Sequence, residues 1–294
     1  MKNKIILLTG ASGFLGSNIA KEIIANEAKL IVLVRTKSNL TRLINLKDNL
    51  EIVNIDTISI SEIFKKYKID LVINAATSYG KKGETIEEIV NANYLFPLSL
   101  LLNSIDSGVK EFINIGTSLQ PFVNEYSFTK HQFVEWLMFH KNKINIKNVV
   151  LEYFYGPEDD SWKFVTMLFE KFKSNAPYID FTSGEQKRNF IYITDVVNAL
   201  INIIDNGCNK DQINFYHIKS SAIITIKDLA YLCKKISKNS VTELNFGVVN
   251  NRIDEIKDAA NDVMNLIGLQ NWHPKTSLIE GLELTWKYIN EKKN

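Results

Sequence analysis

The 294-residue chain has few cysteines, little net charge and no long apolar run, and each shortage excludes a class of protein. Its two cysteines, Cys208 and Cys233, form no CxxC pair and have no histidine beside them. We therefore expect no disulfide scaffold and no metal site, and a reducing compartment fits. The formal charge is only +2, and no basic stripe with interleaved aromatics occurs, so nucleic acid is not an expected partner.

Apolar segments are too short for a membrane anchor or a secretory leader. The longest stretch, Leu95–Leu102, contains Pro97 and Ser99 and cannot span a bilayer. The apolar residues after Met1 end at Thr9, far short of the apolar region of a signal peptide. We therefore expect a cytoplasmic protein that does not associate with membranes.

The first half of the chain alternates short β-branched runs with longer stretches of helical spacing. Expected helices include Phe14–Ala25 and Ile86–Ser107, and the expected strands are Ile5–Leu8, Leu30–Val34, Leu71–Asn74, Glu111–Asn114 and Val149–Tyr153. Such alternation predicts an α/β fold with a Rossmann-type, doubly wound parallel sheet covered by helices on both faces.

After about Pro157 the pattern becomes less regular, with helical stretches at Ile226–Ile236 and Leu278–Ile289. A helix and a short strand near Ile193–Tyr216 are expected to return to the first sheet. We therefore expect residues 1–156 plus about 189–219 to form the first domain. Residues of about 157–188 plus 220–294 should form a smaller, mixed α/β lobe.

A glycine-rich segment, Thr9–Gly16, follows the first expected strand and opens a helix. Gly10 permits a tight turn, Gly13 lets backbone amides approach a pyrophosphate, and Gly16 lets the helix pack closely on the strand. The helix N-terminus supplies N–H donors to phosphates. This order of elements predicts that the first domain binds a dinucleotide, with contacts from Gly10, Ser12, Gly13, Phe14, Leu15 and Gly16.

The end of the second strand bears on which dinucleotide is bound. An NAD site usually has an acid about 20 residues after the glycines, where it bonds the ribose 2′-OH. This chain has Arg35 there, followed by Thr36, Lys37 and Ser38. An arginine pairs well with a 2′-phosphate, so NADP(H) is the predicted cofactor and NAD(H) the alternative. A solvated surface arginine is the competing interpretation.

A tyrosine and a lysine four residues apart, Tyr126 and Lys130, lie on one face of an expected helix. A lysine ammonium favours the phenolate of a nearby tyrosine and lowers its pKa from about 10, which suits acid–base chemistry. An ordinary amphipathic helix has the same spacing. The position after the strand Glu111–Asn114 favours a catalytic pair, with the hydroxyl of Thr117 or, failing that, Ser118 beside the substrate carbonyl.

Several motifs resemble those of the extended short-chain dehydrogenase/reductases, the NAD-dependent epimerase/dehydratase family, over essentially the whole chain. They are TGASGFLG (9–16), NAA (74–76), Thr117, YSFTK (126–130), YGP (155–157), SGEQKRNFIY (183–192) and WHPKTSL (272–278). The stretches TSYGKK, TSGEQKRNFIY and FGVVNNRIDEI resemble family members that reduce the C4 ketone of a nucleotide sugar with NADPH.

The resemblance implies roles for individual residues. Lys130 would also hold the nicotinamide ribose, Asp56 would face the adenine, and Tyr153 stands where the family usually has an asparagine near the sugar phosphate. The predicted cofactor site adds Arg35, Asp56, Ala75, Ala76, Lys130 and Tyr153 to the glycine segment. The predicted substrate site is Thr77, Tyr79, Thr117, Ser118, Tyr153, Arg188 and Arg252, the two arginines being expected at the substrate pyrophosphate. Surface arginines and a core tyrosine are the alternatives.

Differences between the reactions of this family narrow the expected activity. A dehydratase usually has Asp-Glu after the active-site threonine, whereas this chain has Ser118-Leu119-Gln120. The cysteines lie in the wrong segments for an epimerase-reductase. The chain also departs from the family pattern: the segment between Thr117 and Tyr126 is short, Asn189 replaces a common Asp, and Lys219-Ser220 replaces a glycine pair.

The expected function is NADPH-dependent reduction of a nucleotide-linked 6-deoxy-4-keto sugar for surface polysaccharide synthesis. NAD-dependent 4-epimerisation is the alternative, and a non-catalytic NADP sensor is the alternative of another class. A homodimer is also expected, because in this family the helices matching Ile86–Ser107 and Tyr126–His140 pair two subunits. Both helices carry many apolar residues (Leu98, Leu101, Leu102; Phe133, Trp136, Leu137, Phe139). Coverage by the second lobe is the competing interpretation.

Overall fold

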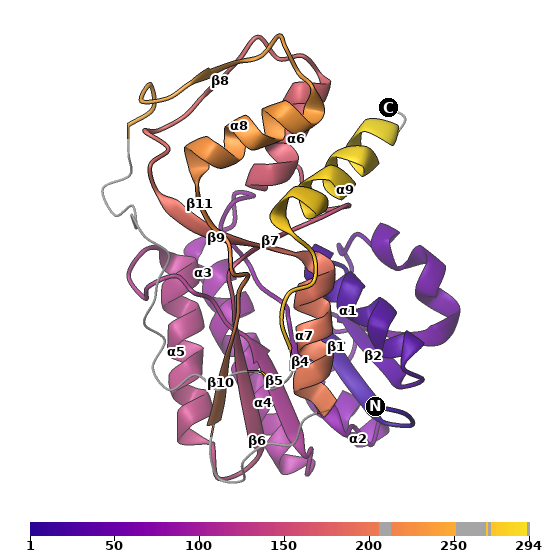
Figure 1. Cartoon of the computed structure of the whole chain (residues 1–294). Helices are drawn as coiled ribbons and strands as arrows, with labels where there is room; N and C mark the ends of the chain where they lie inside the picture. Colours follow the sequence, from indigo (N-terminus) through magenta and orange to yellow (C-terminus); the bar gives the residue numbers. More distant parts are fainter. Residues whose placement is uncertain (206–212, 251–268, 270–271, 293–294) are drawn as a thin grey trace. The chain divides into compact units, whose positions relative to one another are not determined.

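A computed structural model describes residues 1–205, 213–250, 269 and 272–292. The chain divides into two compact units (Figure 1). The first consists of Met1–Leu151, Val197–Ile218 and Val263–Trp272, and the second of Glu152–Val196, Lys219–Asp262 and His273–Asn294. Arg252 and Cys208 lie outside the described residues.

The first unit is built on a parallel sheet, seven-stranded in its described part, with the order β10-β6-β5-β4-β1-β2-β3. The strands are β1 (Ile5–Thr9), β2 (Lys29–Val34), β3 (Leu50–Asn54), β4 (Leu71–Asn74), β5 (Glu111–Ile115), β6 (Asn145–Leu151) and β10 (Ile213–Ile218). Chain order reverses between β1 and β4, which is where doubly wound folds bind ligands. The predicted fold class is confirmed, and β10 returns to the sheet beside β6 as expected.

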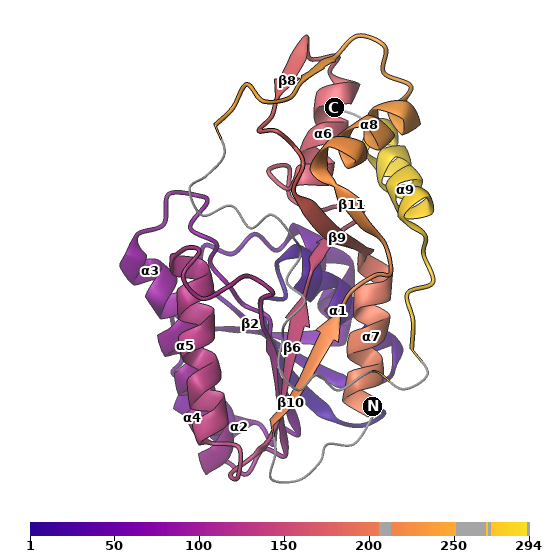
Figure 2. The same ribbon diagram turned by 60° about the vertical axis from the view of Figure 1, so that its left-hand side comes forward.

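Helices cover both faces of this sheet (Figure 2). One face carries α2 (Ile60–Lys66), α4 (Phe96–Asp106) and α5 (Glu125–Phe139), and the other carries α1 (Phe14–Ala25) and α7 (Ile193–Asp205). The 3₁₀ helix η1 (Thr41–Asn49) leads into β3. None of the described helices is long and apolar enough to cross a bilayer.

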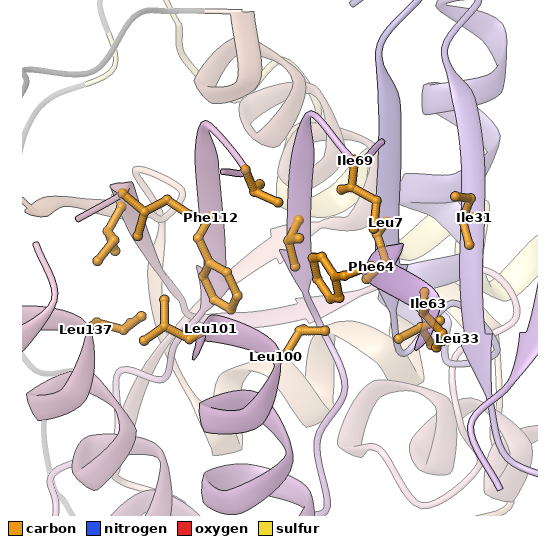
Figure 3. Close-up of a cluster of buried hydrophobic side chains, with 14 of the residues drawn as sticks. Leu7, Ile31, Leu33, Ile63, Phe64, Ile69, Leu100, Leu101, Phe112 and Leu137 are labelled. Carbon is orange, nitrogen blue, oxygen red and sulfur yellow. The ribbon is translucent and has the colours of Figure 1, made fainter. Parts of the chain in front are cut away.

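Buried side chains from strands and helices meet beneath α2, α4 and α5 (Figure 3). Phe112 of β5 packs edge-on against Phe133 of α5, with ring centroids 6.2 Å apart. Leu101, Phe133 and Leu137 belong to this core and are fully buried, so they cannot form part of the expected dimer face. The exposed apolar residues of these helices include Leu102, Trp136 and Phe139.

The long helix expected over 86–107 forms with an interruption. It consists of α3 (Ile86–Val90), a π-helical turn η2 (Asn91–Leu95) and α4. Pro97 explains the π turn, because a proline has no N–H to donate to the carbonyl four residues earlier, that of Asn93. The chain widens there instead, and the Phe96 N–H donates to the Asn91 carbonyl, five residues back.

The expected strand Val149–Tyr153 proves to be the junction of two strands. β6 ends at Leu151 in the first unit, and β7 (Tyr153–Tyr155) begins two residues later in the second. The residues on either side of the junction, Val149–Leu151 and Tyr153–Tyr155, are all apolar or aromatic, so side-chain pattern alone does not separate the two strands. The buried Glu152 lies between them.

The described residues of the second unit form two small sheets and three further helices. β9 (Lys187–Tyr192) pairs with β7 in parallel and with β11 (Ile223–Thr225) antiparallel, and β12 (Glu243–Asn245) pairs with β8 (Tyr178–Asp180). The helices are α6 (Phe164–Lys173), α8 (Ile226–Ser237) and α9 (Leu278–Glu291). Gly281 lets α9 approach β7, because a Cβ there would collide with the Tyr155 hydroxyl.

A row of buried polar side chains joins four neighbouring strands in the first unit, near the carboxyl ends of three of them. Thr9 Oγ1 donates to Asn74 Oδ1 (2.9 Å), Asn74 Nδ2 donates to Asn114 Oδ1 (2.9 Å), and Asn114 Nδ2 donates to Asn148 Oδ1 (2.7 Å). These four residues, here called the asparagine row, are also partners in register on β1, β4, β5 and β6. All are at most 2% exposed, so water does not reach these polar groups and they depend on each other for hydrogen bonds.

The asparagine row predicts a pH-dependent cost for Asn114→Asp. An ionised Asp cannot donate to Asn148 Oδ1, so two acceptors would face each other in the core, and the free energy of unfolding should fall by about 3 kcal/mol at pH 8. A protonated carboxyl can donate, so the loss should shrink as pH falls towards 5. Urea unfolding at several pH values measures this. Asn103→Asp on α4, whose Nδ2 donates to the Ser99 carbonyl, is the matched control. A loss that does not vary with pH would contradict the assigned direction of the row.

Candidate active site

The carboxyl ends of the parallel strands hold the predicted catalytic residues and all but Tyr153 of the predicted cofactor residues. The glycine segment follows β1, Arg35 follows β2, Asp56 follows β3, and Ala75 begins the segment after β4. Thr117 follows β5, and Tyr126 and Lys130 lie on the next helix, α5. The first unit therefore gathers at one edge of its sheet the residues that the sequence places far apart.

The glycine loop has the geometry of a phosphate-binding turn. Gly10 has a positive φ of 71°, and a Cβ there would lie 2.6 Å from the Ala75 carbonyl oxygen. A Cβ at Gly16 would collide with the Gly10 carbonyl, whereas one at Gly13 would approach only that oxygen, at 3.3 Å. Gly13 is the N-cap of α1, whose first turn has no acidic side chain. The turn therefore leaves room and helix N–H donors for an anion, which fits a pyrophosphate.

Arg35 follows β2 and Asp56 follows the neighbouring strand β3. A hydrogen bond from Thr36, the residue after Arg35, joins the two strand ends. The Thr36 amide donates to Asp56 Oδ2 at 2.7 Å, and the Arg35 amide donates to Ser38 Oγ at 3.0 Å. The hydrogen bonds from Thr36, together with the positive charge of Arg35, hold the pKa of Asp56 below its usual value. The end of β2 therefore presents an exposed cation, while the nearby carboxylate is already engaged.

Tyr126 and Lys130 lie one turn apart at the start of α5. Asn124 caps this helix, because its side chain accepts from the Ser127 amide at 2.9 Å while Ser127 Oγ accepts from the Asn124 amide at 3.2 Å. Lys130 is only 3% exposed, and burial lowers the pKa of its ammonium to about 8. No carboxylate among the described residues offsets this burial, so the chain holds an uncompensated cation one helical turn after Tyr126.

The segment after β4 places Tyr79 against Tyr126 of α5 and Thr77 against Asn93 of η2. The ring centroid of Tyr79 lies 4.8 Å from that of Tyr126, with the planes tilted by 37°. Thr77 Oγ1 donates to Asn93 Oδ1 at 3.0 Å. Asn93 was not among the predicted site residues. The sequence does contain a signal for it, because a residue four positions before a proline marks an irregular turn in a helix.

Thr117 and Ser118 begin the short segment that leads to α5. Thr117 Oγ1 accepts from the Leu119 amide at 3.2 Å, so the Thr117 hydroxyl keeps its proton for another acceptor. His131 of α5 donates from Nε2 to the Leu119 carbonyl at 2.8 Å. His131 thus holds this segment against the helix, a role that its sequence position next to Lys130 did not indicate.

Tyr153 and Arg188 are neighbours within the second unit. The Arg188 guanidinium lies 5.8 Å from the centre of the Tyr153 ring, a cation–π distance, and Nη1 donates to the Lys187 carbonyl at 2.8 Å. Tyr153 is 39% exposed, so it is not the core aromatic of the alternative interpretation. Tyr153 therefore offers an aromatic face to the Arg188 guanidinium.

Asn189, where the family commonly has an acid, has a structural role in the second unit. Its Nδ2 donates to the Ser220 carbonyl (2.7 Å) and the Ala222 carbonyl (3.1 Å), and its Oδ1 accepts from the Ser220 amide (2.8 Å). An ionised acid could not donate to these two carbonyls. The two departures from the family pattern, at Asn189 and at Lys219-Ser220, are therefore linked, because the two segments are hydrogen-bonded to each other.

The burial of Lys130 predicts that removing its charge stabilises the ligand-free chain. Between pH 8 and about 10.5, the unfolded chain binds one more proton at Lys130 than the folded chain, so stability rises with pH there. Below pH 8 both states carry the proton and the full cost remains. Lys130→Met should thus raise the free energy of unfolding by about 3 kcal/mol at pH 7, and the gain should fall to about 1 kcal/mol at pH 10. Urea unfolding at pH 7, 8.5 and 10 measures it, and a gain equal at all three values would disprove it.

Known proteins share both the sequence pattern and the fold. The chain is 28% identical over 293 residues to CDP-abequose synthase of Salmonella typhimurium, covering 95% of this chain and 96% of that protein. It resembles the structure of a UDP-glucose 4-epimerase from Thermotoga maritima with a TM-score of 0.82 and 24% identity, covering 97% of this chain and 98% of the other. A UDP-glucuronic acid 4-epimerase from Bacillus cereus gives a TM-score of 0.81, also at 24% identity, with the same two coverages.

Residues 6–218 match the family model described as the NAD dependent epimerase/dehydratase family. These residues include the glycine loop, the asparagine row, Tyr126 and Lys130. Both the predicted resemblance and the prediction of an enzyme are confirmed, and a nicotinamide dinucleotide is the cofactor type that the family uses. The chain belongs to the NAD dependent epimerase/dehydratase family.

Proposed function

We propose that this enzyme uses NADPH to reduce the C4 ketone of a nucleotide-linked 6-deoxy-4-keto sugar destined for a surface polysaccharide. The observation that carries the proposal is the set Tyr126, Lys130 and Thr117 at one sheet edge, with no acid in Ser118–Gln120. A dehydration would need an acid there to remove a proton. The near full-length likeness to CDP-abequose synthase supports a reductase.

The proposed mechanism divides the work among three side chains. The nicotinamide, when bound, supplies the hydride. Tyr126 gives its proton to the C4 oxygen as negative charge develops there. The Thr117 hydroxyl, which keeps a proton to donate, positions the carbonyl. The Lys130 ammonium lies one helical turn from Tyr126, where its charge stabilises the phenolate that remains and its N–H donors reach the ribose.

The substrate's nucleotide would be held by residues of the second unit. Arg188 is oriented by the Tyr153 ring, and a guanidinium binds a pyrophosphate through paired charge-assisted hydrogen bonds. Arg252 has the same proposed role and lies outside the described residues. A panel of CDP-, dTDP-, GDP- and UDP-linked 4-keto sugars with NADPH, with products identified by NMR, tests the reaction and its stereochemistry. Interconversion of C4 epimers without NADPH oxidation would instead identify the 4-epimerase.

Tyr126→Phe should abolish most of the turnover but not the binding of ligands. The substitution keeps the ring and removes the proton, so kcat should fall by about two orders of magnitude or more. NADPH affinity, measured by fluorescence titration, should change little. Thr117→Val should cost less, since it removes one hydrogen bond and no proton. Near-normal turnover of Tyr126→Phe would show that Tyr126 only packs in the helix, and the mechanism would fail.

NADPH should bind more tightly than NADH because of Arg35. A 2′-phosphate would gain a charge-assisted bond with this exposed guanidinium, worth about 10- to 100-fold in affinity. Arg35→Leu should bring the two affinities together, and Arg35→Asp should reverse the preference. Parallel titrations of both cofactors decide the matter. Equal or tighter NADH binding by the wild type would contradict the role of Arg35 and favour the 4-epimerase.

The enzyme should be a homodimer. The exposed apolar residues of η2, α4 and α5 include Leu95 (47% exposed), Leu102 (38%), Trp136 (36%) and Phe139 (78%). Apolar side chains gathered in this way are typical of an interface. Light scattering at micromolar concentration should give twice the chain mass of 33.6 kDa, and Phe139→Lys with Trp136→Lys should reduce it to that of a monomer. A monomeric wild type would rule the dimer out.

A further inference from the structure

The segment from Ala75 to Glu84, here called the strap, is fixed by hydrogen bonds along its length. At its start, Thr9 Oγ1 accepts from the amides of Ala75 (3.1 Å) and Ala76 (3.0 Å). At its end, the Glu84 carboxylate accepts from the Lys82 amide (2.6 Å) and from Ser78 Oγ (3.1 Å), which lowers the pKa of Glu84. These hydrogen bonds restrict the conformations of the strap.

Asn93 ties the middle of the strap to the helix that carries Tyr126. Its Oδ1 accepts from Thr77 Oγ1 (3.0 Å) and the Ser78 amide (2.8 Å), and its Nδ2 donates to the Ser78 carbonyl (2.8 Å) and Thr129 Oγ1 (3.2 Å). All four hydrogen-bonding positions of this amide are therefore used. Asn93 is 1% exposed, so water cannot replace these bonds.

The contacts of Thr129 make this tie specific to the start of α5. Thr129 lies between Tyr126 and Lys130 in sequence, and its hydroxyl donates to the Glu125 carbonyl at 2.7 Å, with the Tyr126 carbonyl at 3.1 Å. Its lone pair is then free to accept from Asn93. The π turn that Pro97 imposes sets the position from which Asn93 reaches both the strap and this turn of α5.

In its middle, the strap places the Tyr79 ring against Tyr126. The next residue, Gly80, has a φ of 65°, and a Cβ there would lie 2.8 Å from Cδ1 of Ile89, so the chain turns sharply after Tyr79. With both sides of Tyr79 fixed, its ring lies 4.8 Å from that of Tyr126. A ring at this distance restricts the rotation of its neighbour.

We propose that Tyr79 is a positioning residue: its ring holds the Tyr126 phenol in the orientation in which it transfers its proton, and Asn93 holds Tyr79 in place. The proposal goes beyond a substrate contact, because it assigns the ring of Tyr79 rather than its hydroxyl. It rests on the proposed role of Tyr126. Loss of the ring therefore lowers kcat while the KM values for NADPH and the nucleotide sugar stay the same.

The test follows the Tyr126 ring itself, independently of activity. In protein labelled with ¹³C at the tyrosine ring, the Tyr126 signal is identified by its loss in Tyr126→Phe. We expect it to broaden in Tyr79→Leu and in Asn93→Ala, because the phenol then takes several orientations. The line width is the readout, since loss of the neighbouring ring alone changes the chemical shift of Tyr126. Tyr79→Phe keeps the ring and should restore the sharp signal. Asn103→Ala, a helical asparagine that does not contact the strap, is the matched control.

The kinetic arm uses the same variants. Tyr79→Leu should lower kcat by about 10- to 100-fold, Tyr79→Phe should recover most of that loss, and the double variant Asn93→Ala/Tyr79→Leu should be no slower than Tyr79→Leu. If Asn93→Ala does not fold, the two Tyr79 variants decide alone. A Tyr126 signal that stays sharp in Tyr79→Leu, or a raised KM with kcat retained, would overturn the proposal. A broadened signal together with an active Tyr126→Phe would overturn the proposed mechanism instead.

Discussion

The asparagine row fixes the edge of the sheet from which every candidate residue of the first unit is placed. The Thr9 hydroxyl accepts two strap amides, so its own proton goes to Asn74, and this choice orients each amide that follows. Because the row joins four strands in one register, the segments that leave β1, β4 and β5 beside it start from fixed points. The glycine loop, the strap and Thr117 all begin at this edge.

The burial of Lys130 at this edge lowers the stability of the folded chain. Lys130 is buried without a described counter-ion, which lowers its pKa to about 8 and makes its charge unfavourable in the folded chain. A buried cation is useful only next to a group that becomes negative during the reaction, as the proposed phenolate of Tyr126 does. The surrounding neutral hydrogen bonds, such as those of Asn93 and Asn124, hold this turn of α5 in place despite the charge.

The sequence predicted the elements with strong periodicity and the motifs whose chemistry is local. The parallel sheet, the glycine loop and the spacing of Tyr126 and Lys130 depend on residues that are close in the chain. The division of the 149–153 run between two strands could not be predicted, because each strand takes its partner from a different unit. Asn93, Asn148 and His131 were missed for a similar reason: their partners come from other elements, and each residue alone resembles an ordinary polar side chain.

The three hydrogen bonds of Asn189 also limit how parts of this chain can be exchanged with those of its relatives. The Asn189 side chain meets two carbonyls and one amide of the 220–222 turn, so the donors and acceptors of the two segments match as a pair. A chimera that took only β9 from a relative with an acid at this position would set a carboxylate against two carbonyl oxygens. Grafts between these enzymes therefore have to transfer β9 and the turn together, although about 30 residues separate them in the chain.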